Sequence, residues 1–212
     1  MNQFDAILFD FDGVLADTEP LHHACWNEVL APLGVAMDWD FYRDHCVGVD
    51  DRQILRLLAE RSDPPREWDA LWARYGEKKE AFRARITAGP PFRPELRPFL
   101  EDLSARYKLA VVSSSGRTEI ETALAAGGLS RCFAALVCGR EAGAVKPDPA
   151  PYALGARLLG AERPLVVEDS EPGQASGRAA GFEVLAVPDA ARTIELLRRR
   201  LDSGSGIAPV VP

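Results

Sequence analysis

Five short apolar runs constrain the fold of this chain more than any other feature of its sequence. Together they are rich in β-branched residues and do not alternate with polar ones, which is typical of strands buried on both faces of a parallel sheet. The runs are Ala6–Phe9, Leu109–Val112, Leu136–Cys138, Leu165–Val167 and Val184–Val187. Segments of helical length separate the later runs and follow the last one: Thr118–Ala126, Ala150–Leu159, Glu171–Ala180 and Ala190–Leu201. This alternation predicts an α/β fold with a doubly wound parallel sheet.

One connection does not fit the alternation. Residues 10–108 separate the first run from the second, which is far more chain than the roughly twelve residues that a crossover needs. Most of this connection has helical patterns with capping residues. We expect Thr18 to cap a helix through Leu33, Asp50 or Asp51 to cap Ile54–Arg61, and two more helices over Glu67–Ile86 and Pro94–Tyr107.

The long connection predicts a domain inserted into the sheet. We expect residues 1–15 and 89–202 to form the α/β core, and residues 16–88 to form an all-helical cap over the carboxyl edge of the sheet. Residues 203–212 are small, polar and proline-ended, so we expect them to form a flexible tail.

Composition narrows the class of protein. The chain has 25 basic and 32 acidic residues and a net charge of −7, which argues against a nucleic-acid partner because binding a phosphate backbone needs a basic face. The four cysteines form no CxxC pair and no zinc pattern with the histidines, so we expect reduced thiols. No apolar run approaches the ~18 residues of a membrane span, and the first residues lack the basic region of a signal peptide. We expect a cytoplasmic protein with no membrane or nucleic-acid partner; its oligomeric state stays open.

Two carboxylates follow the first predicted strand. Asp10 and Asp12 lie two residues apart and therefore leave the strand on the same side, and Gly13 permits the sharp turn that brings both forward. In open α/β sheets, ligands bind at the carboxyl ends of the strands. Two like charges so close repel each other, and a hard cation such as Mg²⁺ would relieve that repulsion.

The later strands end in complementary groups. Ser113, Ser114 and Ser115 precede Gly116 at a predicted helix start, which is a favourable seat for phosphate. Lys146 lies in a proline-containing loop after the third strand, and Glu168 and Asp169 follow the fourth. Each feature alone is more often a turn, a cap or a solvated charge. Their conjunction at successive strand ends indicates phosphoryl transfer.

These motifs, in this order, resemble the four motifs of the haloacid dehalogenase superfamily of hydrolases. The long insertion is similar to the family's helical first cap, and the segment Asp17-Thr18-Glu19-Pro20-Leu21-His22 resembles the β-phosphoglucomutase-like branch. The resemblance covers the chain from Phe9 to about Val187 and implies a haloacid dehalogenase-like core with that cap.

The resemblance also implies a role for each motif residue. Asp10 would be the nucleophile that forms an aspartyl-phosphate, and Asp12 the general acid and base. Ser113 would bind a phosphoryl oxygen with the Ser114 N–H assisting, and Lys146 would pair with the nucleophile. Mg²⁺ would be held by the Asp10 carboxylate, the Asp12 backbone carbonyl and Asp169, with Glu168 nearby.

Position 12 favours phosphate-ester chemistry, because an alcohol leaving group needs a proton and a halide does not. We therefore expect a Mg²⁺-dependent phosphomonoester hydrolase that acts on a small phosphorylated metabolite such as a sugar phosphate. The alternative is a β-phosphoglucomutase-type mutase, since Thr18 and His22 lie where that mutase has Thr and His. However, Asp51 lies where the mutase has its phosphate-gripping arginine, with Arg52 adjacent as a candidate substrate contact.

Two further classes of protein share part of this pattern. A receiver-type phosphoacceptor module also uses an acidic cluster with Lys and Ser, but it has no inserted lid. A non-catalytic binding module would bury Asp10 and Asp12 at a cost and for no purpose. Most aromatic residues of the cap are expected in the cap's own core, with only one or two in a substrate pocket.

Overall fold

Five parallel strands form the sheet at the centre of the computed structural model, which describes residues 3–203. The strands are β1 (Ala6–Phe9), β2 (Lys108–Ser113), β3 (Ala135–Cys138), β4 (Pro164–Glu168) and β5 (Glu183–Ala186). Their order across the sheet is β3-β2-β1-β4-β5. All five predicted strands are confirmed to within two residues at each end, because each predicted run is the part of a strand that both faces of the sheet must bury.

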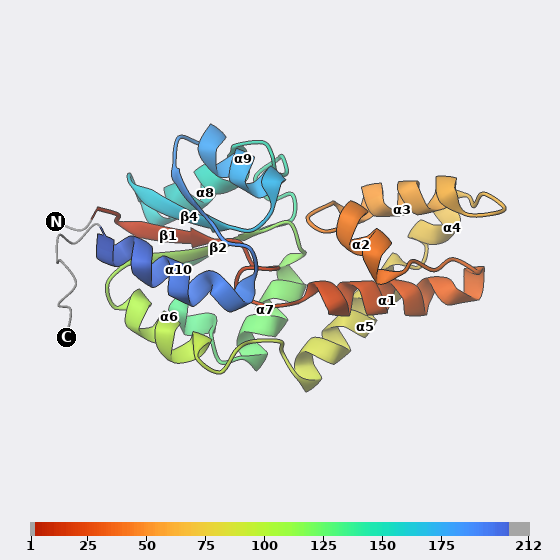
Figure 1. Ribbon diagram of the computed structural model, residues 1–212, viewed down its shortest axis with the longest axis horizontal. Coiled ribbons are helices and arrows are strands. Elements are labelled where there is room, and N and C mark those ends of the chain that lie inside the picture. The colour runs from red at the N-terminus through yellow and green to blue at the C-terminus, as the bar shows by residue number, and fades with distance from the viewer. Residues whose placement is uncertain (1–2, 204–212) are drawn as a thin grey trace.

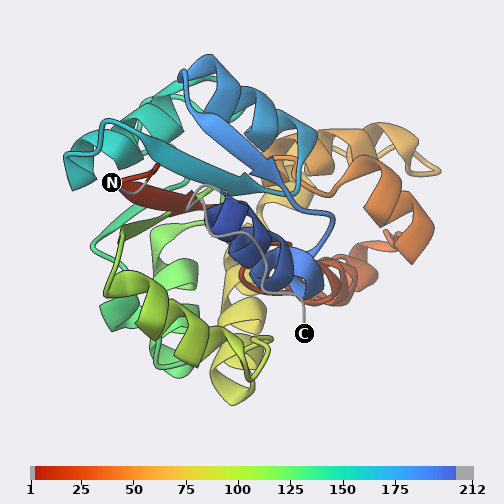
Figure 2. The same cartoon turned by 60° about the vertical axis from the view of Figure 1, so that its left-hand side comes forward.

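Helices cover both faces of the sheet, which confirms the doubly wound α/β fold. Alternate residues of β1 point to opposite faces: Ile7 and Phe9 pack in one core cluster, and Ala6 and Leu8 in another. The first face is covered by α6 (Leu96–Ser104), α7 (Arg117–Ala126) and α10 (Ala190–Ser203). The second is covered by α8 (Ala150–Leu159) and α9 (Glu171–Ala179) (Figures 1 and 2).

The connection between β1 and β2 forms the predicted helical cap. It contains α1 (Glu19–Leu30), the 3₁₀ turn η1 (Ala31–Leu33), α2 (Trp39–His45), α3 (Asp51–Arg61), α4 (Trp68–Trp72) and α5 (Tyr75–Ala88). These helices lie beyond the carboxyl ends of the strands and apart from the sheet (Figure 1). Their own apolar cluster is built around Trp26, Leu55 and Leu71, so the cap has a core of its own. The domain limits at residues 16 and 89 stay a prediction.

Three details of the cap differ from the prediction. The helix predicted over Glu67–Ile86 is two helices, because the Arg74 N–H donates to the Leu71 carbonyl three residues back and interrupts the regular ladder. Helix α2 was not predicted; its start is capped by Asp38, which accepts from the Phe41 N–H at 2.7 Å.

Capping of the first cap helix also differs. Thr18 occupies the N-cap position of α1, but its side chain makes no capping bond because its hydroxyl donates to Asp12 instead. By contrast, the Asp50 carboxylate accepts from the Arg52 N–H at 2.9 Å, which confirms one of the two caps predicted for α3.

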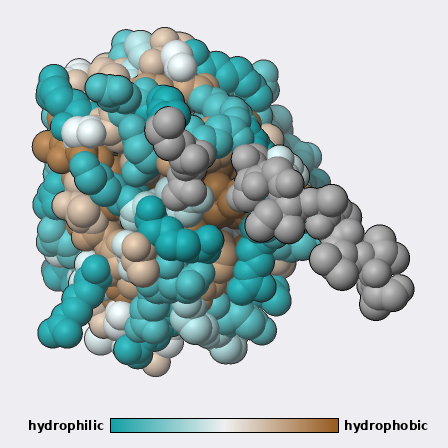
Figure 3. Space-filling model, turned by 90° about the vertical axis from the view of Figure 1, so that its left-hand side faces the viewer, coloured by the Kyte–Doolittle hydropathy of each residue, from teal (hydrophilic) through white to brown (hydrophobic). Residues whose placement is uncertain are grey.

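Figure 3 shows the side of the molecule that lies farthest from the cap. Its surface is mostly hydrophilic, with apolar residues scattered among the polar ones (Figure 3). Within residues 3–203, no helix is long and apolar enough to cross a bilayer. Ser203 ends α10, and the rest of the tail predicted at 203–212 lies outside the described residues.

Candidate active site

The first two carboxylates leave the sheet at its central strand. The Asp10 N–H donates to the Val167 carbonyl at 3.0 Å, so the pairing of β1 with β4 continues to this residue. Gly13 then turns the chain with a φ of +74°, and a Cβ there would lie 2.0 Å from the Asp169 carboxylate. The turn therefore requires glycine both for its backbone conformation and for the close approach of Asp169.

Lys146 joins two buried carboxylates across the strand ends. Its ammonium lies 2.8 Å from Asp10 Oδ1 and 2.5 Å from Glu168 Oε1. Burial lowers the pKa of Lys146, but the two carboxylates outweigh burial and raise it above its ordinary value. The loop after β3 thus delivers a fully charged cation to the end of β1.

Glu168 is fully occupied by the protein. Its side chain has no exposed surface; Oε1 also accepts from the Tyr152 hydroxyl at 2.8 Å, and Oε2 accepts from the N–H and hydroxyl of Ser170, each at 3.0 Å. A Cβ at Gly173 would lie 1.7 Å from Oε1, so α9 can begin beside this carboxylate only with glycine at that position. Glu168 therefore anchors Lys146 and has little capacity left for a ligand of its own.

Asp169 has the opposite character. Among residues 3–203, no donor contacts its buried Oδ1, and one oxygen from each of Asp10, Glu168 and Asp169 lies within 4.8 Å of the others. Burial and the charge of Glu168 raise the pKa of Asp169 to about 7, and the same causes raise the pKa of Asp10. An orphaned oxygen beside a second carboxylate fits a hard divalent cation such as Mg²⁺, which takes oxygen ligands.

Asp12 faces the cap side of the site. Its Oδ1 accepts from the Thr18 hydroxyl and lies 3.4 Å from His22 Nε2, and its Oδ2 accepts from the Ser115 hydroxyl at 2.7 Å. Burial alone would raise the pKa of Asp12, but His22 and the two hydroxyl donors together lower it well below its usual range. The His22 ring is held by stacking on Phe82, with centroids 4.2 Å apart.

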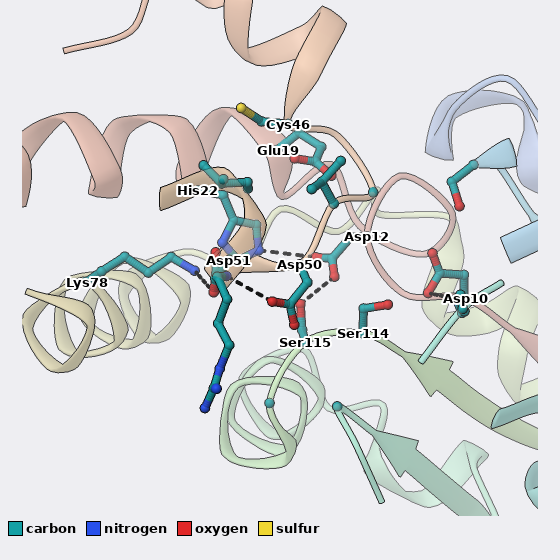
Figure 4. Close-up of a pocket in the computed structure, with 18 of the residues that line it drawn as sticks. Asp10, Asp12, Glu19, His22, Cys46, Asp50, Asp51, Lys78, Ser114 and Ser115 are labelled. Carbon is teal, nitrogen blue, oxygen red and sulfur yellow. Dashed lines mark hydrogen bonds and ion pairs between the residues drawn. The ribbon is translucent and has the colours of Figure 1, made fainter. Parts of the chain in front are cut away.

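A cavity of about 270 Å³ separates the core from the cap (Figure 4). Of the predicted site residues, seven line it: Asp10, Asp12, His22, Arg52, Ser114, Lys146 and Asp169. The other three, Thr18, Ser113 and Glu168, are at most 4% exposed and lie behind this lining. Ser113 donates to Asp12 Oδ2 at 3.4 Å and accepts from the Ser115 N–H at 3.0 Å, so it orders the turn after β2.

Several residues of the site were not predicted. Tyr152 and Ser170 hold Glu168, and Ser115, like Ser113, donates to Asp12. The cap supplies the three aromatic residues Tyr42, Trp72 and Tyr75 to the cavity, one more than the most expected. A sequence signal existed for Ser115, which belongs to the serine triplet already singled out, and for the cap aromatics as a group, but not for Tyr152.

Comparisons with known proteins agree with this arrangement. The sequence profile of the haloacid dehalogenase-like hydrolase family matches residues 7–187. A phosphorylated carbohydrates phosphatase of Thermotoga maritima is 32% identical over 182 residues, which cover 84% of this chain and 82% of that protein. The fructose-1-phosphate phosphatase YqaB of Escherichia coli is 30% identical over 188 residues, which cover 87% and 97%.

Solved structures of similar proteins share this fold. CbbY from Rhodobacter sphaeroides in complex with phosphate superposes with a TM-score of 0.75 at 28% identity, covering 87% of this chain and 86% of that one. A mutant of the same protein in complex with xylulose-(1,5)bisphosphate matches equally well.

The chain therefore belongs to the haloacid dehalogenase-like hydrolase family, as the motifs predicted. Within that family it belongs to the β-phosphoglucomutase-like and CbbY-like branch with a helical cap. By class, it is a phosphatase of the haloacid dehalogenase type.

Proposed function

We propose that the protein is a Mg²⁺-dependent phosphomonoester hydrolase that acts on a small sugar phosphate through an aspartyl-phosphate. The observation that carries this proposal is the position of Asp10 at the cavity, paired with Lys146 at 2.8 Å. Asp10 adjoins Asp169, whose buried Oδ1 accepts no hydrogen bond from the residues that the structure describes. Phosphoryl transfer requires a nucleophile, a cation and a carboxylate oxygen that can bind a metal ion, all close together.

Asp10 is the nucleophile of the proposed reaction. One of its carboxylate oxygens attacks phosphorus while the bond from phosphorus to the substrate oxygen breaks, which leaves the phosphoryl group on Asp10. Lys146 holds this carboxylate in place and reduces its repulsion of the incoming phosphate. Anchoring of Lys146 by Glu168 keeps the ammonium in position during the transfer.

Asp12 is the general acid and general base of the proposed reaction. With a lowered pKa it is ionised in the free site, which is the form that takes a proton from the attacking water in the second half of the reaction. A phosphate dianion held against Asp10 raises the pKa of Asp12, because like charges disfavour each other. Asp12 can then take up a proton from solvent and give it to the leaving oxygen in the first half. In the second half it receives a proton from the water that attacks phosphorus while the bond from phosphorus to Asp10 breaks.

Asp10 and Asp169 would hold the cation, with Glu168 as their support and the Asp12 carbonyl as the predicted backbone ligand. When bound, Mg²⁺ neutralises charge on the transferring phosphoryl group and on the two carboxylates. The match between an orphaned buried oxygen and an oxygen-seeking ion supports this assignment.

The substrate is proposed from the cavity and the relatives. A volume of about 270 Å³ suits one small metabolite. The similar proteins of Thermotoga maritima and Escherichia coli are named for phosphorylated carbohydrates and for fructose 1-phosphate, and CbbY has been solved with a phosphorylated sugar.

Substitution of the nucleophile tests the proposal. Asp10→Asn keeps the shape of the side chain and removes its charge, so turnover of p-nitrophenyl phosphate should fall by at least about 1,000-fold. Asp17→Asn, at an exposed carboxylate outside the cavity, is the matched control and should retain full activity. Circular dichroism establishes that both variants are folded. Retained activity in folded Asp10→Asn would remove Asp10 as the nucleophile.

One observation favours a mutase as the second candidate. His22 lies 3.4 Å from Asp12, in the position where the resemblance places the mutase histidine. Incubation with β-glucose 1-phosphate and catalytic glucose 1,6-bisphosphate separates the two activities, because a mutase yields glucose 6-phosphate and a hydrolase yields free phosphate.

A further inference from the structure

The cap wall of the cavity is acidic. It presents the three carboxylates of Glu19, Asp50 and Asp51 together with the two cations of Arg52 and Lys78. The Arg52 guanidinium lies 4.8 Å above the Trp72 ring, and the only other cap cation on this wall, within the described residues, is Lys78. With Arg52 lying over Trp72, the pairing of Lys78 strongly affects how well the wall can receive an anion.

Lys78 is occupied by Asp51. Its Nζ lies 3.3 Å from Asp51 Oδ2, and the side chain is only 2% exposed, against 26% for Asp51. The rings of Trp26 and Phe82 lie 5.4 and 5.6 Å from the ammonium and keep it away from bulk water. Asp51 is fixed in turn, because its Oδ1 accepts from Trp26 Nε1 at 3.0 Å. Figure 4 shows Lys78 extended toward Asp51.

The wall is well suited to neutral hydroxyl groups. Carboxylate oxygens accept hydrogen bonds from sugar hydroxyls. Trp72 and Tyr75 also line the cavity and stack on each other with centroids 4.4 Å apart, which places an apolar part of the wall beside its carboxylates for the C–H groups of a sugar. A second phosphate at this wall would instead meet three carboxylates against two cations, and one of those cations, Lys78, is already paired with Asp51.

We propose that Asp51 determines substrate specificity by making the enzyme select sugar phosphates with one phosphate group over bisphosphates. This inference rests on the proposed hydrolase function. It specifies in addition that the part of the substrate that faces the cap carries no phosphate group. It distinguishes this chain from CbbY of Rhodobacter sphaeroides, which has been solved with a bisphosphate in complex.

The test compares matched substrates with the whole enzyme loaded with Mg²⁺. We measure kcat/KM for fructose 1-phosphate against fructose 1,6-bisphosphate, and for glucose 6-phosphate against glucose 1,6-bisphosphate. The wild type should favour the monophosphate of each pair by at least about 10-fold. A wild-type preference for either bisphosphate overturns the proposal without any variant.

Two substitutions should move this ratio in opposite directions. Asp51→Asn keeps an acceptor for Trp26 and frees the charge of Lys78, so it should shift the ratio toward bisphosphate by about 10-fold or more. Lys78→Gln leaves Asp51 unneutralised and should shift the ratio further toward monophosphate. An unchanged ratio in folded Asp51→Asn overturns the proposal, and if that variant does not fold, Lys78→Gln and the wild-type ratio decide.

The control separates a local effect from net charge. Asp44→Asn removes one exposed cap carboxylate that does not line the cavity, and it should leave the ratio unchanged. An equal shift in Asp44→Asn and Asp51→Asn would overturn the proposal. Turnover of p-nitrophenyl phosphate distinguishes the two levels: if it is absent in the wild type, the hydrolase function fails, and if it is present with no ratio effect, only the role of Asp51 fails.

Discussion

The floor and the wall of the cavity are built on different principles. The floor comes from strand ends of the core, where Asp10, Lys146 and Glu168 are buried and satisfy one another. The wall comes from helices of the cap, where a single ion pair, Asp51–Lys78, lies among aromatic rings. At a sheet edge, neighbouring strands hold the side chains in fixed positions relative to one another, whereas in the cap each helix positions its side chains separately. The floor can therefore keep one chemistry while the wall changes its selectivity.

The two regions also differ in what a substitution costs. Removing one partner from a buried ion pair leaves an uncompensated charge and costs about 3–5 kcal/mol of stability. The floor connects three charged side chains in this way, so few changes there preserve both fold and activity. Wall residues that pack partly against solvent tolerate substitution better. Changes to the floor should thus affect every substrate alike, and changes to the wall should depend on the substrate.

Metal removal is the largest expected effect and tests the floor. Chelation with EDTA should lower turnover of every phosphomonoester by at least about 1,000-fold, because the charge of Asp10 and Asp169 is then uncompensated. Added Mg²⁺ should restore activity and raise the melting temperature, since a ligand that binds only the folded state stabilises it. Full activity in chelator, or losses that differ strongly among substrates, would contradict a common metal-dependent floor.

Lys146→Met is expected to have the next largest effect. It should lower kcat by about 100- to 1,000-fold for all substrates, because one preorganised charge is lost from the transferring group. It should also lower the free energy of unfolding by about 3–5 kcal/mol, measured by urea denaturation, because Asp10 and Glu168 lose their shared cation.

Lys108→Met is the matched control for that prediction. Lys108 is the first residue of β2, at the edge of the sheet opposite the active site; its ammonium donates to the Leu159 carbonyl at 2.7 Å, and it does not line the cavity. Activity should survive in this variant. If Lys146→Met lost activity toward one substrate only, Lys146 would act in substrate selection, as the wall does, and not in the chemistry common to all substrates.

The sheet was more predictable than the cap for a physical reason. Buried parallel strands need continuous apolar runs, and such runs can be found in the sequence without any knowledge of their neighbours. The break between α4 and α5 has no comparable signal. Gly76 lies two residues after Arg74, but it is itself part of α5, because an isolated glycine is tolerated within a helix. It coincides with a tertiary contact in which Arg74 Nε donates to the Val29 carbonyl of α1 at 3.1 Å.

The same distinction applies to the site. Asp10, Lys146, Glu168 and Asp169 could be expected to meet because each follows a strand, and parallel strands end at one edge. Tyr152 could not be expected at the site from the sequence, because its contact with Glu168 depends on how α8 packs across β1, β2 and β3. Contacts between helices, such as those that form the wall, cannot be predicted from the sequence either, because they too depend on tertiary packing.

Trp72→Leu is the smallest expected effect and tests the wall. Aromatic contacts contribute about 0.5–1.5 kcal/mol, so the substitution should raise KM for sugar phosphates by about 2- to 10-fold. The floor is untouched, so kcat should stay within about twofold. Trp68→Leu is the matched control, because Trp68 stacks on Trp72 at 5.3 Å but does not line the cavity. A fall in kcat equal to the rise in KM would mean that the wall helps to position the reacting phosphate, and that floor and wall are not separable.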